Sequence, residues 1–311
     1  MLSAAGELRV ASWLDFDTLA REGRKADVLI VRANLPAALF NDAPRLRAAI
    51  RHGAGLDMVP MEAANTAGVL VANVPGVNAQ TVAEHVFFAA MAVLRRFRMV
   101  DRDLRQRDWV TGRDHGEKAH ELAGRTLGVV GAGNIGNAVM RIARYGFGLP
   151  VLANSRNAKS LPEDVRFVTV DELVAEADIV VLSCPLTSET KGLLSRERIR
   201  RMRSGAILVN VSRGAIVDDA GLIEALREGW IGGAALDVFA TQPLPPGHPY
   251  FSFDNVVITP HLAGITEESM MRMGVGAAQE ALRVLSNHLP VNLRNPEVLP
   301  RYRERFPANS E

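Results

Sequence analysis

A glycine-rich loop between an apolar strand and a helix is the feature that most constrains the fold of this chain. The loop follows a strand predicted over residues 126–130 and opens a helix predicted over 134–145. Gly131 permits a tight turn, Gly133 permits close approach of the backbone to a pyrophosphate, and Gly136 permits close packing of helix on strand. Free amide groups and the positive end of the helix dipole would then face the phosphates. We therefore expect a dinucleotide to contact Gly131, Gly133, Asn134, Ile135 and Gly136; the alternative is a tight turn that binds no ligand.

The residues at the end of the next strand indicate which dinucleotide binds. An NAD site usually has Asp or Glu roughly 20 residues after the loop, where it binds the ribose 2′-hydroxyl. This chain has Asn154-Ser155-Arg156-Asn157 there. Arg can pair with a 2′-phosphate and Ser can donate to it. We predict that NADP(H) is preferred over NAD(H), which stays possible, with contacts from Ser155, Arg156 and Asn157; in the alternative, Arg156 only faces solvent and Ser155 caps a helix.

Strands and helices alternate along the chain. Short apolar runs predict buried strands at 27–31, 47–50, 68–72, 126–130, 151–153, 179–182, 206–209, 233–236 and 256–258. Helices are predicted at 44–46, 61–66, 81–98, 134–145 and 267–285. The charged stretch 101–121 reads as a hinge and domain boundary. This alternation is typical of an α/β fold with parallel sheets and helices on both faces.

Composition excludes several classes of protein. A chain of 311 residues is long enough for two domains, and a net charge of +1 gives no indication of a nucleic-acid or membrane partner. The single cysteine, Cys184, excludes an intrachain disulfide. The N-terminus lacks a signal-peptide pattern and no apolar run is long enough to span a bilayer, so we expect a cytoplasmic protein. No metal site is expected.

Polar residues follow three consecutive strands of the predicted nucleotide-binding half. They are Arg213, Asp237 with Gln242, and His261. Ligands of open α/β sheets bind outside the carboxyl ends of strands, so these side chains are expected to meet near the nicotinamide. Arg213 could bind a 2-oxo carboxylate, His261 could exchange a proton with the substrate oxygen, and Asp237 could hold the carboxamide. Taken singly, His261 could be an ordinary turn residue and Arg213 a surface ion pair.

These features occur together in one known family. The glycine loop, Cys184-Pro185-Leu186-Thr187, Val211-Ser212-Arg213-Gly214, Leu236-Asp237-Val238-Phe239 and Pro260-His261 occur in the order and spacing of the D-isomer-specific 2-hydroxyacid dehydrogenases, which this chain resembles from about residue 48 to 289. That family includes phosphoglycerate dehydrogenases, glyoxylate/hydroxypyruvate reductases and formate dehydrogenases. The resemblance implies two Rossmann-like, doubly wound parallel-sheet domains with the active site in a cleft between them. It also implies a homodimer built largely through the cofactor domain.

The resemblance extends to the domains and the site. It implies an outer, substrate-binding domain of residues 1–97 plus 288–311 and a dinucleotide-binding domain of 98–287. The family's carboxylate-binding amides correspond to Ala54 and Gly55, its arginine to Arg213 and its acid/base histidine to His261. Contacts on the adenosine and nicotinamide sides of the cofactor correspond to Cys184, Pro185, Thr190, Val211, Ser212, Asp237 and Gly264.

One position departs from the family pattern. Most members have Glu where this chain has Gln242, and that Glu hydrogen-bonds the histidine. An amide can orient the His261 ring but supplies no negative charge, so His261 should hold its proton less tightly. Formate dehydrogenases also carry Gln there. His85, His52 and the basic run 196–203 are more simply explained as a packed helical histidine, a structural loop residue and a solvated helix end.

The leading hypothesis is reduction of a small 2-oxo acid, such as glyoxylate or hydroxypyruvate, to the D-2-hydroxy acid with NADPH. A phosphoglycerate-type or formate dehydrogenase is a second possibility. A nucleotide-sensing protein that binds the dinucleotide without turnover is a third. Gln242 favours the formate alternative, whereas the missing NAD-type acid and the presence of Arg213 and His261 favour the first hypothesis.

Overall fold

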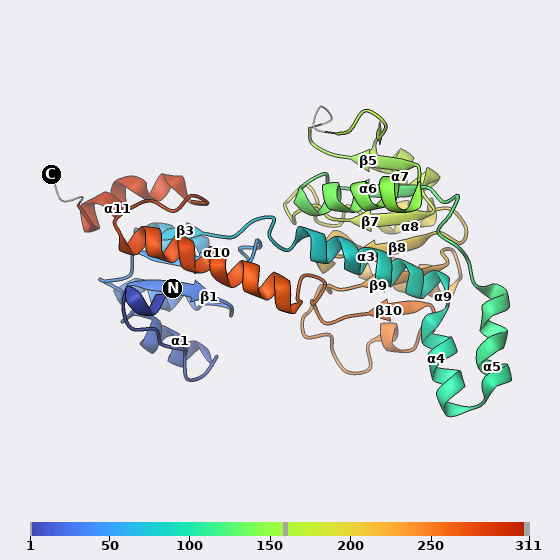
Figure 1. Ribbon diagram of the computed structural model, residues 1–311, viewed down its shortest axis with the longest axis horizontal. Helices are drawn as coiled ribbons and strands as arrows, with labels where there is room; N and C mark the ends of the chain where they lie inside the picture. The colour runs from blue at the N-terminus through green and yellow to red at the C-terminus, as the bar shows by residue number, and fades with distance from the viewer. Residues whose placement is uncertain (1, 158–160, 308–311) are drawn as a thin grey trace. The chain divides into compact units, whose positions relative to one another are not determined.

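The computed structural model describes residues 2–157 and 161–307. The chain forms two compact units, each with its own parallel sheet (Figure 1). The first unit comprises Met1–Asn78 and Thr266–Glu311, and the second comprises Ala79–Ile265. The predicted α/β class is confirmed.

The sheet of the second unit carries the glycine loop. Seven strands lie in the order β10-β9-β8-β7-β4-β5-β6, and every neighbouring pair is parallel. The chain order reverses between β4 and β7, which is where open α/β sheets bind ligands. The strands are β4 (Leu127–Val130), β5 (Val151–Asn154), β6 (Arg166–Phe167), β7 (Ile179–Leu182), β8 (Ile207–Asn210), β9 (Gly233–Leu236) and β10 (Val256–Ile258).

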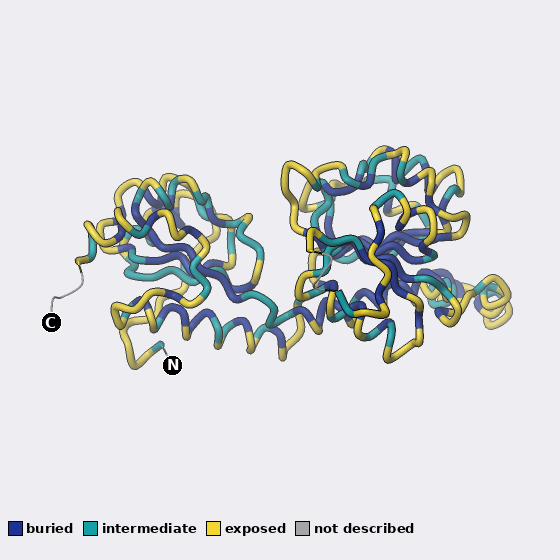
Figure 2. Tube along the Cα trace, turned by 90° about the horizontal axis from the view of Figure 1, so that it is seen from above, coloured by how far each residue is buried: buried dark blue, intermediate teal, exposed yellow. Residues whose placement is uncertain are grey.

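Helices cover both faces of this sheet, which is why its central strands are apolar throughout. Alternate residues, such as Val129 and Val181, pack with α3 (Ala79–Leu94) and α6 (Asn134–Phe147). The intervening residues pack with α7 (Val170–Glu176), α8 (Arg196–Arg200) and α9 (Asp219–Arg227). The strands accordingly run through the buried centre of the unit (Figure 2).

The first unit is a smaller version of the same architecture. Its sheet has the order β1-β2-β3, formed by β1 (Val28–Val31), β2 (Ala48–Arg51) and β3 (Leu70–Ala72). One face packs on α1 (Phe16–Gly23) and α2 (Met61–Thr66). The other packs on α10 (Glu267–Leu285) and α11 (Leu299–Arg305).

Two expectations about the middle of the chain were wrong. The helix predicted over 81–98 ends at Leu94, because Arg96 adopts a left-handed backbone conformation with φ of 52° and a new helix begins at Phe97. The stretch 101–121 is not a hinge: it lies within the second unit and forms α4 (Phe97–Gln106) and α5 (Trp109–Asp114). Asp108 caps α5 by accepting a hydrogen bond from the Thr111 amide at 2.8 Å.

One short helix predicted in the first unit is also absent. Residues 44–46, predicted as helix, contain a turn.

The chain passes between the two compact units at two places. At each place, the bounds of the units differ from those of the predicted domains by one helix. The predicted crossings follow residues 97 and 287, whereas the observed ones follow residues 78 and 265. Helix α3 therefore belongs to the second unit, where Val86 and Ala90 join the core of the large sheet. Helix α10 belongs to the first, where Ala277 and Ala281 pack on the small sheet.

Candidate functional site

The glycine loop has the geometry that its sequence predicts. Gly131 has a φ of 100°, and a Cβ there would lie 2.6 Å from the Cys184 backbone nitrogen. A Cβ on Gly136 would collide with the carbonyl oxygen of Gly131, so only glycine lets α6 approach the loop this closely. At Gly133 a Cβ would meet no atom within 4 Å. The open side of Gly133 thus leaves room for a group to approach the backbone.

The start of α6 leaves its first amide groups available. Gly133 is the N-cap and provides no side-chain hydrogen bond, and the first turn contains no acidic residue. Asn134 is exposed and Ile135 is half-buried. Uncapped amides and the helix dipole together favour a phosphate at this position, so the loop fits a dinucleotide.

The end of β5 presents polar residues and no carboxylate. The Asn154 side chain points inward and donates to the Val168 carbonyl oxygen at 2.9 Å. The Ser155 hydroxyl accepts a hydrogen bond from the Asn157 amide at 3.3 Å, and Arg156 is exposed. The local turn therefore presents a guanidinium to solvent beside a hydroxyl.

The loop after β7 packs directly on the glycine loop. The Cys184 thiol is buried, which raises its pKa, and the Ser212 hydroxyl donates to the Cys184 carbonyl oxygen. The Thr190 hydroxyl donates to the Pro185 carbonyl oxygen at 2.6 Å. Thr190 thus organises its own turn, and with Pro185 it stays a predicted cofactor contact.

The loop after β8 is held by a residue that the sequence analysis did not single out. The buried Asn210 side chain accepts from the Ser212 amide and donates to the Arg213 carbonyl oxygen, both at 3.1 Å. Arg213 donates to the Ser212 carbonyl oxygen at 2.7 Å. Gly214 lies so close to the Phe239–Ala240 peptide that a Cβ could not be accommodated. The Arg213 loop is therefore fixed against the loop that carries Gln242.

Asp237 organises the loop that follows β10. Its carboxylate is buried, with 3% of the residue exposed. Oδ1 accepts from the Thr259 hydroxyl at 2.6 Å and from the Leu262 amide at 2.8 Å, and Oδ2 accepts from the Ala263 amide at 3.0 Å. These hydrogen bonds join Asp237 to residues 259–263, and Asp237 stays a predicted contact of the cofactor carboxamide. Gly264 follows this loop directly.

The predicted pair of His261 and Gln242 is present. His261 Nδ1 and Gln242 Oε1 are 3.1 Å apart, and the Gln242 amide nitrogen donates to the Phe239 carbonyl oxygen at 3.4 Å. Because the amide nitrogen is turned to Phe239, its oxygen faces the ring and accepts from Nδ1–H. His261 has a left-handed φ of 55°, a conformation that costs roughly 1–3 kcal/mol and persists only where the surroundings enforce it. Its own amide donates to the Asp237 carbonyl oxygen at 2.8 Å.

The loop after β2 in the first unit carries Ala54 and Gly55. The Asn73 amide donates to the Ala54 carbonyl oxygen at 2.5 Å, and Arg294 donates to the Asn73 side-chain oxygen at 2.6 Å. Within residues 2–157 and 161–307, the backbone amides of Ala54 and Gly55 donate no hydrogen bond. Asn73 therefore holds this loop through the Ala54 carbonyl group, and these hydrogen bonds do not use the Ala54 and Gly55 amides. Neither Asn73 nor Arg294 had a signal in the sequence, because their contacts join distant segments.

The two histidines assigned structural roles differ in their surroundings. His52 is buried beside Arg32 and Arg51; burial is the main cause of its lowered pKa, and the two guanidinium groups add to it. His85 contacts the Thr259 hydroxyl at 3.3 Å, and burial lowers its pKa against the opposing effect of Asp237. His52 fits the expected structural role, whereas His85 is connected to the loop of His261. The basic run from residue 196 begins with the short helix α8, as expected.

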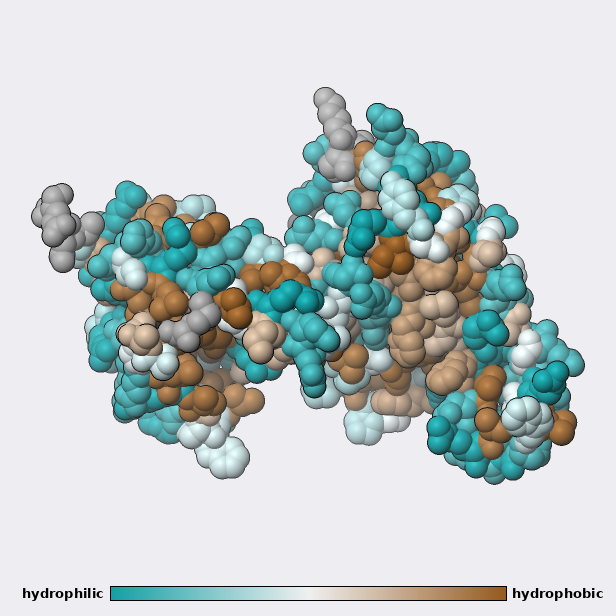
Figure 3. All heavy atoms as spheres, in the orientation of Figure 1, coloured by the Kyte–Doolittle hydropathy of each residue, from teal (hydrophilic) through white to brown (hydrophobic). Residues whose placement is uncertain are grey.

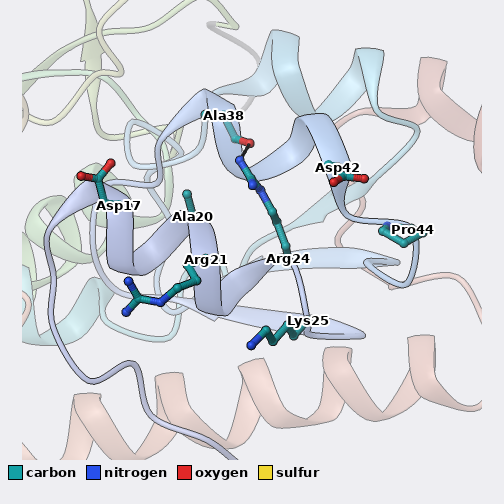
Figure 4. Close-up of a pocket in the computed structure, with 8 residues that line it drawn as sticks. All are labelled: Asp17, Ala20, Arg21, Arg24, Lys25, Ala38, Asp42 and Pro44. Atoms are coloured by element: carbon teal, nitrogen blue, oxygen red, sulfur yellow. Dashed lines mark hydrogen bonds between the residues drawn. The ribbon is translucent and has the colours of Figure 1, made fainter.

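A pocket of about 520 Å³ lies elsewhere, on the surface of the first unit (Figure 4). Its lining mixes three cationic side chains with two carboxylates and contains no predicted site residue; the lining residues are Asp17, Ala20, Arg21, Arg24, Lys25, Ala38, Asp42 and Pro44. In the part of the chain that the structure describes, no cluster of potential ligands suits a metal ion. No helix among the described residues is long and apolar enough to cross a membrane.

Comparison with known proteins gives a consistent picture. The family model for the D-isomer specific 2-hydroxyacid dehydrogenase, NAD binding domain, matches residues 87–263. A glyoxylate reductase of Aeropyrum pernix is 37% identical over 293 residues, which are 91% of this chain and 87% of that protein. A glyoxylate/hydroxypyruvate reductase B of Pectobacterium carotovorum is 38% identical over 260 residues, 83% of this chain and 81% of that protein. The structure of an NAD-dependent formate dehydrogenase from Staphylococcus aureus in complex with NAD is similar with a TM-score of 0.77 and 31% identity, over 86% of this chain and 82% of that one.

Proposed function

Because the chain belongs to the D-isomer specific 2-hydroxyacid dehydrogenases, we propose that it reduces a small 2-oxo acid to the D-2-hydroxy acid with NADPH. Glyoxylate and hydroxypyruvate are the first substrates to test, because similar proteins are named as reductases of these acids. The observation that carries the proposal is the His261–Gln242 pair, which lies in the same sheet-edge cluster of loops as Arg213 and the glycine loop.

The residues of the second unit would hold the cofactor along this edge. The amides of Asn134 and Ile135 and the open side of Gly133 would receive the pyrophosphate. Ser155 and Arg156 would bind a 2′-phosphate, which an acidic residue at this place would repel. The nicotinamide, when bound, supplies the hydride. The remaining predicted contacts are Asn157, Cys184, Pro185, Thr190, Val211, Ser212, Asp237 and Gly264.

Three kinds of group would act on the substrate. Arg213 would bind its carboxylate and polarise its carbonyl oxygen, with the Ala54 and Gly55 amides as further carboxylate donors. His261 would give a proton to that oxygen from Nε2, because Nδ1 is occupied by Gln242. In the reverse direction the same nitrogen would accept the proton.

A spectrophotometric assay tests this proposal. The enzyme is incubated with glyoxylate, hydroxypyruvate, pyruvate and longer 2-oxo acids, each with NADPH and with NADH. We expect oxidation of NADPH by at least one small 2-oxo acid and a lower kcat/KM with NADH. Equal or better rates with NADH would remove the cofactor preference. Tight cofactor binding with no turnover of any acid would instead indicate a nucleotide-binding protein.

Formate oxidation is a second candidate because of the Gln242–His261 contact. Formate has no hydroxyl group, so its oxidation to carbon dioxide needs no base to accept a hydroxyl proton. A neutral histidine partner would suffice for that reaction. Reduction of NAD⁺ or NADP⁺ by formate at a rate above that of 2-oxo acid reduction would favour this alternative, and no reduction would exclude it.

We also propose that the chain forms a homodimer through the second unit. Large apolar side chains are exposed on α3, α4, α5 and α6, including Phe88, Phe97, Trp109 and Tyr145, which are 55–76% exposed. Figure 3 shows a broad hydrophobic area over the face of this unit on which α3 lies. Apolar surface of this kind is uncommon on monomers and typical of protein interfaces.

A further inference from the structure

A chain of hydrogen bonds connects a histidine on α3 with the loop that carries His261. His85 Nε2 lies 3.3 Å from the Thr259 hydroxyl, and that hydroxyl donates to Asp237 Oδ1 at 2.6 Å. Asp237 in turn accepts the amides of residues 261–263 through its carbonyl and carboxylate oxygens. All of these groups belong to the second unit.

The direction of each hydrogen bond follows from the number of hydrogens available. A threonine hydroxyl has one hydrogen. The hydrogen of the Thr259 hydroxyl points to the Asp237 carboxylate, which can only accept while ionised. Thr259 must therefore accept from His85, so Nε2 of His85 carries a hydrogen. Burial lowers the pKa of His85, which favours the neutral ring, and the hydrogen bond to Thr259 selects the Nε2–H tautomer of that ring.

Asp237, at the end of this series of hydrogen bonds, supports a strained backbone conformation. His261 is one of three non-glycine residues with positive φ in the described part of the chain. Its amide and the two amides that follow all donate to Asp237. Rotation of the Asp237 carboxylate would release Leu262 and Ala263 together, and the left-handed conformation of His261 would lose its support.

We propose that His85 and Thr259 are positioning residues for His261. They fix the Asp237 carboxylate in the rotamer that holds the Leu262 and Ala263 amides, so that the His261 ring meets Gln242 and directs its other nitrogen to the substrate. The inference rests on the proposed reduction of a 2-oxo acid, in which His261 exchanges the proton. It assigns to α3, whose inner face packs in the core, a role in aligning the acid/base group.

Substitutions at Thr259 separate the hydroxyl from the shape of the side chain. Thr259→Val preserves the branched shape and removes the hydrogen bond, whereas Thr259→Ser keeps the hydroxyl. We expect Thr259→Val to lower kcat about tenfold, as for loss of one hydrogen bond to a charged group, with KM for the oxo acid changed less than about twofold. Thr259→Ser should stay within about twofold of the wild-type kcat. Equal loss in both variants would point to packing and overturn the inference.

A double-mutant cycle tests whether His85 acts through Thr259. His85→Ala should lower kcat by itself, and His85→Gln, which retains a donor, should recover part of the loss. Because both residues belong to one chain of hydrogen bonds, His85→Ala combined with Thr259→Val should be no slower than the slower single variant. Effects that multiply would mean independent roles and would contradict the proposal.

Amide hydrogen exchange gives a readout that does not depend on turnover. In the cofactor-free protein, the Leu262 and Ala263 amides of Thr259→Val should exchange at least about tenfold faster than in wild type, while Thr259→Ser should not differ. If the wild-type protein reduces no 2-oxo acid, the proposed function fails, and exchange alone decides the positioning role. If it does, unchanged exchange or unchanged kcat in Thr259→Val overturns the inference.

Discussion

The Gln242 side chain orients His261 without supplying a negative charge. Gln242→Glu would place a carboxylate on Nδ1 and favour the imidazolium form, which raises the pKa of the ring. Reduction requires the protonated ring, so activity would persist to higher pH. We predict that the alkaline limb of kcat/KM for 2-oxo acid reduction moves upward in Gln242→Glu. The measurement is a pH profile of both proteins in one buffer series.

Gln242→Met is the matched control, because it fills similar space and accepts only weakly. Its profile should not move upward, and its kcat should fall because the ring is no longer oriented. A profile of Gln242→Glu that coincides with wild type would mean that residue 242 does not act on His261 during the reaction.

Arg156 bears on the choice of cofactor. It is exposed, next to the Ser155 hydroxyl at the end of β5. Arg156→Ala should lower kcat/KM for NADPH about 10- to 100-fold, the equivalent of a charge-assisted hydrogen bond of about 1.5–3 kcal/mol. The value for NADH should change less than about twofold, and NADH thereby serves as the internal control. A parallel loss with both cofactors would show that Arg156 acts on folding or on a shared part of the nucleotide.

At the scale of single residues, the sequence indicates candidates for chemical roles more readily than the residues that hold them in place. Arg213, Gln242 and His261 follow strands and form a chemically coherent set, so the sequence predicts them as candidates, and the contact between His261 and Gln242 is present. The contact of Thr259 with His85 could not be predicted, because a hydrogen bond between residues 174 positions apart leaves no pattern in one chain. The main hydrogen bonds of Asp237 were missed for the same reason. The Asn210 side chain bonds its near neighbours Ser212 and Arg213, and a single Asn at the end of a strand does not show that its side chain turns back on the following loop.

In the glycine loop that joins β4 to α6, substitutions of two glycines are expected to have opposite effects on stability and on cofactor binding. Gly136→Ala would force a Cβ into the Gly131 carbonyl, so it should destabilise the protein by about 1–3 kcal/mol, as overpacking does. Gly133→Ala meets open space and should leave the melting temperature nearly unchanged while weakening cofactor binding. Differential scanning calorimetry and a fluorescence titration with NADPH measure the two effects. Undiminished cofactor affinity in Gly133→Ala would mean that the pyrophosphate lies elsewhere.

A carboxylate on α4 binds the residue that follows α5, and its charge should make the packing of this segment sensitive to acid. Asp103 is bound by Arg102 and by His115 Nε2 at 2.8 Å, and these contacts hold its pKa well below the usual range. A depressed folded-state pKa contributes stability above the unfolded value near 4 and loses it as pH falls toward the folded value. Asp103→Asn should therefore lower the melting temperature more at pH 7 than at about pH 3. An equal decrease at both pH values would assign the effect to packing alone.

At the scale of elements, buried strands were the most predictable part. The runs at 179–182, 233–236 and 256–258 coincide with β7, β9 and β10 because a strand covered on both faces is continuously apolar. The break between α3 and α4 at Arg96 could not be predicted, because the sequence around it is compatible with a continuous helix. Charge along α4 and α5 suggested a linker, yet it reflects the solvated faces of two short helices.

For the whole molecule, the bounds of the two compact units are what the sequence indicates least directly. Helices α3 and α10 are both long and apolar on at least one face, and either could cover either sheet. Their assignment depends on small residues that match a particular surface: Ala83 and Ala90 in α3, and Ala277 and Ala281 in α10. Complementarity of this kind arises only once both partners are folded, so one sequence does not show it.

The proposed dimer gives a prediction for the assembled molecule. Trp109 begins α5 and is 67% exposed, and large apolar residues at the centre of an interface commonly contribute about 2 kcal/mol or more to binding. Trp109→Glu should therefore raise the dimer dissociation constant at least about 30-fold, which sedimentation equilibrium would detect as a monomer at micromolar concentration. Trp13→Glu is the matched control, because Trp13 is 73% exposed and belongs to the first unit. Dimers should persist in that variant. A monomeric wild-type protein, or dissociation by Trp13→Glu alone, would move the interface away from the second unit and leave the exposed face of α3 to another partner.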